Sequence, residues 1–258
     1  MTDKQLTRRR FLLGTFGAAT LALAGCDVSG SETTAGRVLR SAESLTLAAQ
    51  RRLQGRNALA REYNEVHISP HFRVNGTSMP DSDLYMSLLK NHFADWHLKV
   101  DGLVAQPREF SLAALKLMPA RTQITRHDCV EGWSAIGKWT GVPLAEVLRA
   151  TGVLPSARYV VFHCADELET TLDGSGRYYE SIDLVDAYHP QTILAYGMNG
   201  TDLPVGHGAP LRLRVERQLG YKQAKYLMRI ELTDSLQGYG GGNGGYWEDR
   251  GYEWYAGI

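Results

Sequence analysis

The sequence predicts a single α+β domain built from mixed β-sheets with short helices. Apolar strand-like segments outnumber the helical patterns, and every helical pattern after residue 90 is short. The 258 residues, 43% of them hydrophobic, are enough to bury one sizeable core. We find no internal repeat, and no linker after residue 40, so one domain is the economical interpretation.

Composition excludes several classes of protein. The 28 Lys and Arg residues balance 28 Asp and Glu residues, which gives no support for a nucleic-acid-binding protein. Charged residues at 22% and aromatic residues at 9% argue against a disordered chain. Three cysteines are too few for a disulfide-stapled scaffold, and their odd number leaves at least one unpaired.

The first 25 residues have the layout of an export signal, which is a positively charged start followed by a short apolar run. The arginines at 8–10 stand directly before Phe11 and resemble a twin-arginine signal, with an ordinary export signal as the alternative. Residues 1–25 are therefore excluded from the predicted fold.

The apolar run ends at Cys26, and the preceding Leu-Ala-Gly resembles the lipobox of bacterial lipoproteins. We expect Cys26 to carry a lipid, although a plain cleavage site that happens to include cysteine is the alternative. Asp27 resembles a signal that retains such proteins at the inner membrane. Residues 26–36 then form a tether, and the expected location is the periplasmic side of the inner membrane.

Residues 37–66 are predicted to be an N-terminal helical segment. The amphipathic pattern runs from Val38 to about Tyr63, with apolar residues every three or four positions. The apolar positions of this pattern are Val38, Ala42, Leu45, Ala49 and Leu53.

The domain proper is expected over residues 67–236. It begins with a strand from Trp96 to Val100, which enters a hairpin through a tight turn at Asp101-Gly102. A short helix over 112–118 follows Ser111, whose hydroxyl can cap it, and Pro119 ends it.

Residues 122–125 are predicted to form the next strand. Pro143 at its start and Gly152 past its end then mark a second short helix. Four more strands are expected at 159–162, 193–196, 211–215 and 226–232, and Asn199-Gly200 is expected to form a hairpin between two of them.

The last residues, 237–258, form a glycine-rich and aromatic tail. The glycine-rich part lacks the Lys and Ser/Thr of a phosphate-binding P-loop, so we do not expect it to bind phosphate. The aromatic end can either cap a cleft or pack on the body of the protein, and packing is the preferred interpretation.

Cys129 is the leading candidate for a catalytic or metal-binding residue. It stands in a polar cluster with His127, Asp128 and Glu131, and this cluster follows an apolar strand. Three interpretations come from the residues themselves. Cys129 can be an acyl-transfer nucleophile with His127 or His163 as base, or a zinc ligand together with His127, His163 and Cys164, or a buried structural cysteine.

A further interpretation comes from a family resemblance. Cys-Val-Glu-Gly-Trp-Ser at 129–134, followed by Trp-Thr-Gly-Val-Pro-Leu at 139–144, resembles the molybdenum-cysteine segment of the sulfite oxidase family of molybdopterin oxidoreductases. The resemblance extends from Trp96 to about Thr233 and implies the sulfite-oxidase-type molybdopterin-binding fold. Its other matching segments are 96–102, 159–166, 194–204, 207–212 and 220–225.

This resemblance implies a Mo-molybdopterin cofactor with Cys129 as the protein ligand of the metal. A soft thiolate suits such a metal. Tyr196 is expected to hydrogen-bond the transferred oxygen and Asp166 to accept from the pterin ring N–H groups. The phosphate of the cofactor is expected to meet His207, Arg212 and Lys225. Gln223 and Ala224 complete the matched contacts, and Cys164 is expected to be buried near the cofactor.

The loop that precedes the first strand has two candidates. Lys90-Asn91-His92 resembles part of the sulfite-oxidising pattern, but it stands unusually close to Trp96. Phe72-Arg73-Val74-Asn75-Gly76 has a spacing closer to the reductase type and is the preferred cofactor-facing loop. The imperfect sulfite-type pattern puts sulfite in doubt as the substrate.

The resemblance implies oxygen-atom transfer on a sulfur compound, either sulfoxide reduction or sulfite-type oxidation. Electrons are expected to be exchanged with a separate cytochrome c or a haem membrane protein. A protein with the same fold that binds the cofactor, or nothing, without turnover is the alternative.

Overall fold

The computed structural model describes residues 45–53, 55, 57–171, 174 and 176–258. The chain divides into two compact units, Met1–Leu53 and Gln54–Ile258. Of the first unit only residues 45–53 are described, and they are helical. The predicted export signal, the lipid site Cys26 and the tether lie outside the described residues.

The predicted helix does not continue to Tyr63. Beyond the gaps, residues 57–64 contain no helix, and Tyr63 N–H donates to the carbonyl of Ile124 at 2.9 Å. Glu62 also forms an isolated antiparallel bridge with Thr125. The helical prediction is wrong here because pairing with a neighbouring strand satisfies the backbone groups that a helix would have paired internally.

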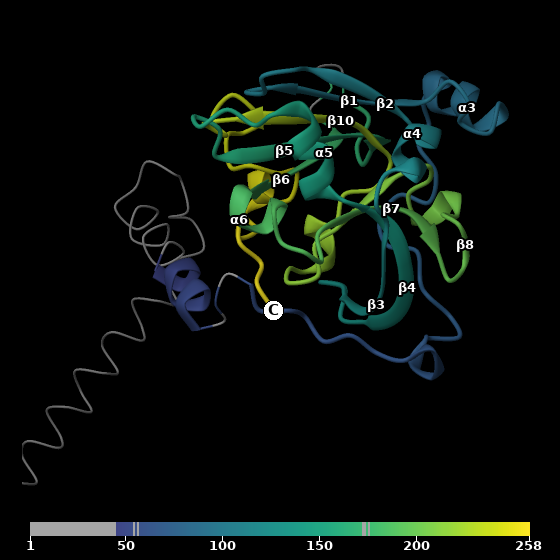
Figure 1. The fold of residues 1–258 in the computed structure, drawn as a ribbon, viewed down its shortest axis with the longest axis horizontal. Coiled ribbons are helices and arrows are strands. Elements are labelled where there is room, and N and C mark those ends of the chain that lie inside the picture. The colour runs from purple at the N-terminus through teal and green to yellow at the C-terminus, as the bar shows by residue number, and fades with distance from the viewer. Residues whose placement is uncertain (1–44, 54, 56, 172–173, 175) are drawn as a thin grey trace, which may run out of the picture. The chain divides into compact units, whose positions relative to one another are not determined.

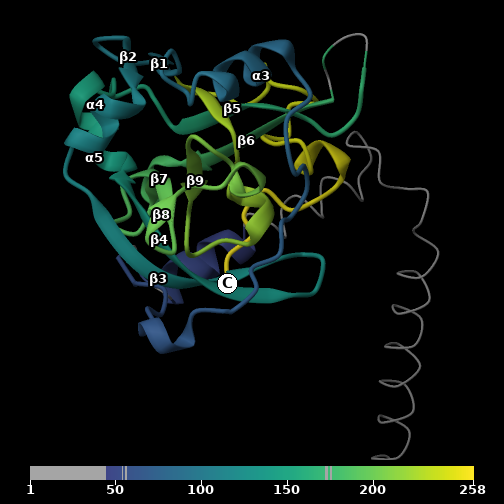
Figure 2. The ribbon, with the colours of Figure 1, turned by 90° about the vertical axis from the view of Figure 1, so that its right-hand side faces the viewer.

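The second unit contains two five-stranded sheets that lie one above the other in Figure 1 and again in Figure 2. In the first sheet β1 pairs with β10 in parallel, and its other neighbouring strands are antiparallel. Its strands, in spatial order, are β2 (Arg108–Ser111), β1 (His97–Gly102), β10 (Leu227–Thr233), β5 (Tyr159–Glu167) and β6 (Arg177–Asp183).

The second sheet is antiparallel, and β7 lies at its centre with β4 on one side. The other side of β7 is shared, because β9 pairs with its first half and β8 with its last residues. The strands are β3 (Arg121–Asp128), β4 (Ser134–Pro143), β7 (Ile193–Met198), β8 (Thr201–Asp202) and β9 (Arg212–Arg214).

The helices of this unit are short, as predicted. Ser111 Oγ accepts from Ala114 N–H at 3.1 Å at the start of α4, and Gly152 ends α5 with φ of 68°. The α-helices are α3 (Asp83–Lys90), α4 (Leu112–Leu117), α5 (Leu144–Thr151) and α6 (Leu184–Ala187). Single 3₁₀ turns occur at Glu65–His67, Val205–His207, Gly220–Lys222 and Glu248–Arg250. None of the described helices is long and apolar enough to cross a membrane.

Two hydrophobic clusters hold the sheets together. The larger one includes Trp96, which is fully buried and donates through Nε1 to the carbonyl of Leu227 at 3.2 Å. The smaller one gathers Phe72 and Trp139 with residues of β7. The expected α+β class with mixed sheets and short helices is therefore confirmed.

Three local predictions need correction. The turn predicted at Asp101-Gly102 is absent, because β1 continues through Gly102. A Cβ at Gly102 would lie 2.2 Å from the carbonyl oxygen of Leu232, so this glycine permits close strand contact. Asn199 and Gly200 form a hairpin, but they join β7 to β8 and not to β9. Strands β4 and β6 were not predicted. In β6, polar residues such as Glu180 occupy buried positions, which hides the strand pattern.

Candidate active site

Cys129 lies in the loop between β3 and β4 and lines a cavity of about 160 Å³. The loop is closed by its own backbone, because Cys129 N–H donates to Trp133 at 2.9 Å and Cys129 C=O accepts from Gly132 at 3.0 Å. Gly132 has φ of 85°, a conformation that glycine adopts without strain. The thiol is thus carried by a short, well-defined loop at the end of a long hairpin.

Five predicted site residues meet at this cavity, which are Asn75, Cys129, Asp166, Gln223 and Lys225. They come from well-separated parts of the chain, so only the tertiary structure brings them together. The other lining residues are Gly76, Thr77, Val130, Glu131, Leu168, Tyr178, Gly220, Tyr221, Trp247 and Tyr252.

The loop over residues 72–77 is fixed beside the cavity by Lys225. The ammonium group donates to the carbonyls of Asn75 at 2.7 Å and Gly206 at 3.0 Å, and also to that of Thr77. An ammonium has three N–H donors, so all of them are occupied. Lys225 therefore clamps this loop, and it does not have a free donor for the phosphate that the sequence assigned to it.

Arg212 is fully buried and is not neutralised by a carboxylate partner. Its guanidinium donates to the carbonyls of His207 at 3.0 Å and Gln223 at 3.1 Å, and it forms no ion pair in the described part of the chain. Burial and the charge of Arg214 lower its pKa to about 9. A buried cation without a counterion is costly, which indicates that an anion belongs here.

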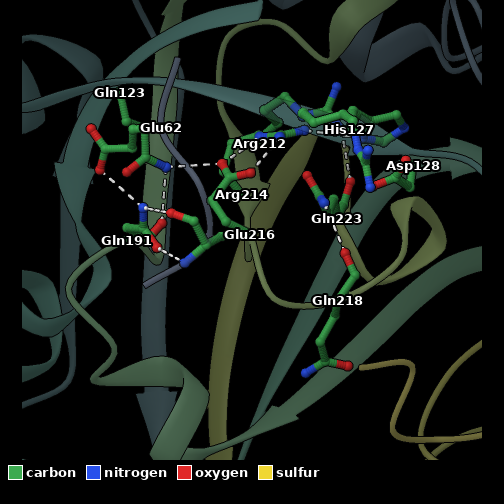
Figure 3. Close-up of polar contacts among 12 residues, drawn as sticks. Glu62, Gln123, His127, Asp128, Gln191, Arg212, Arg214, Glu216, Gln218 and Gln223 are labelled. Atoms are coloured by element: carbon green, nitrogen blue, oxygen red, sulfur yellow. Dashed lines mark hydrogen bonds and ion pairs between the residues drawn. The ribbon is translucent and has the colours of Figure 1, made fainter. Parts of the chain in front are cut away.

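His127 is buried beneath the cavity and is oriented by an ion pair (Figure 3). Arg214 donates from Nη1 to His127 Nδ1 at 3.0 Å, and from Nε and Nη2 to Glu216 at 2.9 and 2.7 Å. Because guanidinium is only a donor, Nδ1 must accept and the ring proton must sit on Nε2, near Gln223. Burial and the two nearby arginines hold the pKa of His127 well below its usual value.

These basic residues, His127, His207, Arg212, Arg214 and Lys225, are here called the cationic cradle. Burial, followed by the charge of Arg212, lowers the pKa of His207 to about 4 and that of Lys225 to about 7. Burial also raises the pKa of Asp166 to about 6, against the opposing effect of Lys225. The cradle is thus a desolvated, cation-rich site.

The donors and acceptors of the cradle fit the cofactor that the sequence predicts. In the described part of the chain, five buried polar atoms without a hydrogen-bond partner belong to residues assigned to the cofactor from the sequence. They are Asn75 Oδ1, Asp166 Oδ1, His207 Nδ1, Arg212 Nε and Gln223 Oε1. Acceptors for pterin N–H groups and a cation for a phosphate are what a molybdopterin requires, so its chemistry would satisfy groups that the folded chain leaves unsatisfied.

Other predicted site residues lie behind the cavity or apart from it. Phe72, Cys164, Ala224, His207 and Arg212 are buried or half-buried and do not line it. Burial raises the pKa of the Cys164 thiol well above its usual value, as expected for a structural cysteine.

Three predictions are not supported by the geometry. Arg73 and His92 are exposed and do not line the cavity, so the loop at 72–76 reaches the site through Asn75 and Gly76, and residues 90–92 do not. Tyr196 is also outside the lining, and Lys116 Nζ lies 5.7 Å from its ring centre. Along β7, Ala195 packs in the smaller core cluster and Tyr196 packs against the larger one, as strand alternation requires.

The alternative chemistries for Cys129 also fail on geometry. The described residues contain no group of three or more His, Cys, Asp or Glu side chains that could hold a metal ion, which excludes the zinc set. His163 pairs with Glu231 at 3.0 Å, and His127 Nδ1 is engaged by Arg214. A Cys-His dyad is therefore not formed.

Sequence reasoning missed several lining residues. Tyr178 is buried and its hydroxyl donates to the carbonyl of Tyr221. Trp247 and Tyr252 reach the cavity from the C-terminal tail, so this tail both packs on the body and covers the site. No motif marks these residues, because strand β6 was not predicted and the tail has no fixed pattern.

The profile of the oxidoreductase molybdopterin-binding domain family matches residues 86–239, which hold Cys129, Asp166 and the whole cradle. The chain belongs to this family. It is an oxidoreductase that binds Mo-molybdopterin, and the predicted resemblance to the sulfite oxidase family is confirmed.

Two curated relatives are similar to the chain in sequence. It is 38% identical to YedZ1 of Azospira oryzae, provisionally named a protein-methionine-sulfoxide reductase subunit, over 97% of this chain and 87% of the relative. It is 36% identical to the protein-methionine-sulfoxide reductase catalytic subunit MsrP of Ralstonia nicotianae, over 67% of this chain and 53% of the relative. Among solved structures, the sulfane dehydrogenase SoxCD of Paracoccus pantotrophus aligns with a TM-score of 0.49 and 24% identity, over 55% of this chain and 39% of that one.

Proposed function

We propose that the chain is the catalytic subunit of a reductase for methionine sulfoxide in proteins. The reaction removes one oxygen atom from sulfur: the sulfoxide takes up two electrons and two protons and leaves as thioether and water. The names of the two curated relatives support this substrate.

The charge of the cavity lining carries the choice between sulfoxide and sulfite. Glu131 and Asp166 contribute two carboxyl groups. The three donors of Lys225, which is the one Lys or Arg among the described lining residues, are already bonded to backbone carbonyls. The lining therefore offers a sulfite anion no cationic donor that is free to bind it, whereas a neutral sulfoxide does not require one.

The residues of the chain bind and orient the reacting groups. Burial raises the pKa of Cys129 in the protein without metal, so the thiol must lose its proton when it ligates molybdenum. Asp166 and Asn75 offer acceptors toward the pterin, and Arg212 and His207 offer the charge and donor for its phosphate. When bound, the molybdenum–pterin group supplies the two-electron chemistry.

We further propose that the chain is exported by the twin-arginine route and anchored through a lipid on Cys26, with Asp27 keeping it at the inner membrane. The support is the order of arginines, apolar run and cysteine in residues 8–26. Electrons would then come from a separate cytochrome c or a haem membrane protein on the periplasmic side. Mass determination of the mature N-terminus tests the anchor.

The experiment for the activity uses holoenzyme purified from a host that makes the cofactor. We expect molybdenum close to one atom per chain, and oxidation of a reduced viologen dye upon addition of an oxidised, methionine-rich protein. Oxidation of sulfite with cytochrome c should be much slower. Holoenzyme that oxidises sulfite and leaves methionine sulfoxide untouched would refute the proposed direction and substrate.

A further inference from the structure

Two aromatic side chains of the C-terminal tail line the same cavity as Cys129. The rings of Trp247 and Tyr252 stack, with centroids 5.3 Å apart and an angle of 29° between their planes. Tyr246 meets the Trp247 ring edge-on at 5.3 Å, and Tyr221 meets the Tyr252 ring edge-on at 5.2 Å. We call the stacked pair Trp247 and Tyr252 the aromatic wall.

The aromatic wall is held in place by buried charges behind it. Glu248, next to Trp247 in the chain, is buried and pairs with Lys222, which also pairs with Glu180. Tyr252 N–H donates to the carbonyl of Trp247 at 3.0 Å, which closes the turn that brings the two rings together. The wall is therefore organised before any ligand arrives, which lowers the entropy cost of binding.

The wall lies beyond the part of the chain that matches the family domain, which ends at residue 239. The cradle lies within the matched part, whereas the wall comes from the tail that follows it. The two parts can therefore carry different tasks, the first holding the cofactor and the second selecting the substrate.

We infer that the aromatic wall is the element that recognises the methyl-sulfur end of a methionine sulfoxide side chain. This inference rests on the proposed function. The methyl-sulfur end of a methionine sulfoxide is its apolar end and packs favourably on aromatic side chains, whereas its oxygen needs a polar partner. Contact with the wall therefore directs the oxygen away from the rings and toward the part of the cavity that Cys129 lines.

The rim of the cavity suits a side chain that is presented by a protein. Tyr252 is 40% exposed and Val130, beside Cys129, is 44% exposed, so apolar surface continues from the cavity to the outside. A methionine sulfoxide on an exposed or unfolded segment can then enter while its backbone stays at the rim. Exposed apolar surface at a polar cleft is common where another chain is bound.

The test compares ring removal with ring retention in the holoenzyme. Trp247→Leu and Tyr252→Leu remove one ring each, whereas Trp247→Phe and Tyr252→Phe keep an aromatic face. Tyr188→Leu is the matched control, because Tyr188 is 38% exposed, close to the exposure of Tyr252, and does not line the cavity. The probe is N-acetyl-methionine sulfoxide, with an oxidised protein as second substrate.

Three quantities are measured for each variant: molybdenum per chain, KM and kcat with a reduced dye, and Kd by calorimetry on the oxidised holoenzyme. The oxidised enzyme cannot donate the two electrons that sulfoxide reduction requires, so binding is measured without turnover. We expect each Leu variant to raise Kd and KM about 2- to 10-fold, with molybdenum content unchanged. The Phe variants and Tyr188→Leu should stay within about twofold of wild type.

The possible results separate this inference from the proposed function. If wild type reduces the sulfoxide and the Leu variants bind it equally well, the aromatic wall does not recognise substrate and only this inference fails. If molybdenum content falls together with activity in the Leu variants, the wall is a cofactor contact and the inference is overturned. If molybdenum-loaded wild type reduces no sulfoxide, the proposed function itself fails and the inference falls with it.

Discussion

Two buried charge clusters near the cavity differ in how their charge is balanced. The first, here called the tail clasp, is Lys222 with Glu180 and Glu248, all fully or almost fully buried. Burial and the nearby Glu248 raise the pKa of Glu180 well above its usual value, so that one carboxyl group holds a proton and the clasp is neutral. In the cationic cradle Arg214 is balanced by Glu216, but Arg212 bonds only to carbonyls.

The difference distinguishes a structural cluster from a binding site. Both clusters meet the cost of moving charge out of water, but only the tail clasp has a carboxylate partner for every buried cation, whereas Arg212 of the cradle has none in the described part of the chain. The uncompensated charge of the cradle is what an anionic cofactor group would neutralise. A buried cation without a counterion is thus a better indicator of the site here than a perturbed pKa by itself.

Removing one cation from each cluster is the most direct test of the difference in charge balance. Lys222→Met leaves two buried carboxyl groups without a cation, and we expect the free energy of unfolding of the apoprotein to fall by about 3–5 kcal/mol. Arg212→Met removes an unbalanced charge and should cost clearly less, while molybdopterin content falls about tenfold or more. Urea denaturation and cofactor analysis measure the two effects. Equal destabilisation by both substitutions would contradict the distinction between the clusters.

Cys129→Ser tests the chemical end of the cradle. We expect turnover to fall at least about a hundredfold, because the hard hydroxyl replaces the soft thiolate at the metal. The free energy of unfolding of the apoprotein should change by less than about 1 kcal/mol, since the thiol is half-buried and lies in a loop. Steady-state kinetics and urea denaturation are the measurements, and Cys164→Ser serves as the control for loss of a buried cysteine. Wild-type turnover in Cys129→Ser holoenzyme would exclude Cys129 as the metal ligand.

The pH dependence of the free energy of unfolding should reflect the protonation of His127. Its pKa in the folded protein lies well below 6.5, so below about pH 6.5 the unfolded chain binds a proton that the folded chain does not. The free energy of unfolding therefore falls with decreasing pH, by up to about 1.4 kcal/mol per pH unit for one such proton. Asp166, whose pKa is raised to about 6, works in the opposite direction.

His127→Gln removes the titrating ring and should flatten the loss of stability between about pH 6.5 and 5 relative to wild type. Urea denaturation at several pH values measures the slope, and His67→Gln is the control for an exposed histidine outside the cradle. An unchanged slope in His127→Gln would show that this ring is not neutral in the folded protein.

Glu180→Gln is the mildest change in the tail clasp. The amide mimics the protonated carboxyl group that burial favours, so the free energy of unfolding at pH 7 should stay within about 1 kcal/mol of wild type or rise. Because the folded pKa of Glu180 is raised, the wild type loses stability as pH rises above about 4.5, and this loss should be absent in the variant. Denaturation at pH 5 and pH 8 tests it. A cost comparable with that of Lys222→Met would show that Glu180 is ionised in the clasp.

Much of the fold was predictable because its signals are local. Ser111 before an apolar run and Gly152 after one fix the ends of α4 and α5 through groups within a few residues, so each helix could be located without knowing its partners. Strand β6 could not be located in this way, since its buried Glu180 is satisfied by Lys222, a residue 42 positions away. The turn at Gly102 was misplaced for the same reason, because the constraint comes from β10.

The difference between local sequence signals and long-range contacts also applies to the site. The sequence was enough to predict the family, which is confirmed, and to propose Cys129 as the metal ligand together with cofactor contacts such as Asp166 and Arg212, because these residues stand in ordered motifs. Only the tertiary structure decided that Lys225 is used as a clamp and that Tyr196 is not among the residues that line the cavity. It also decided that Trp247 and Tyr252 line the cavity, since no local pattern encodes a contact with residues more than a hundred positions earlier in the chain.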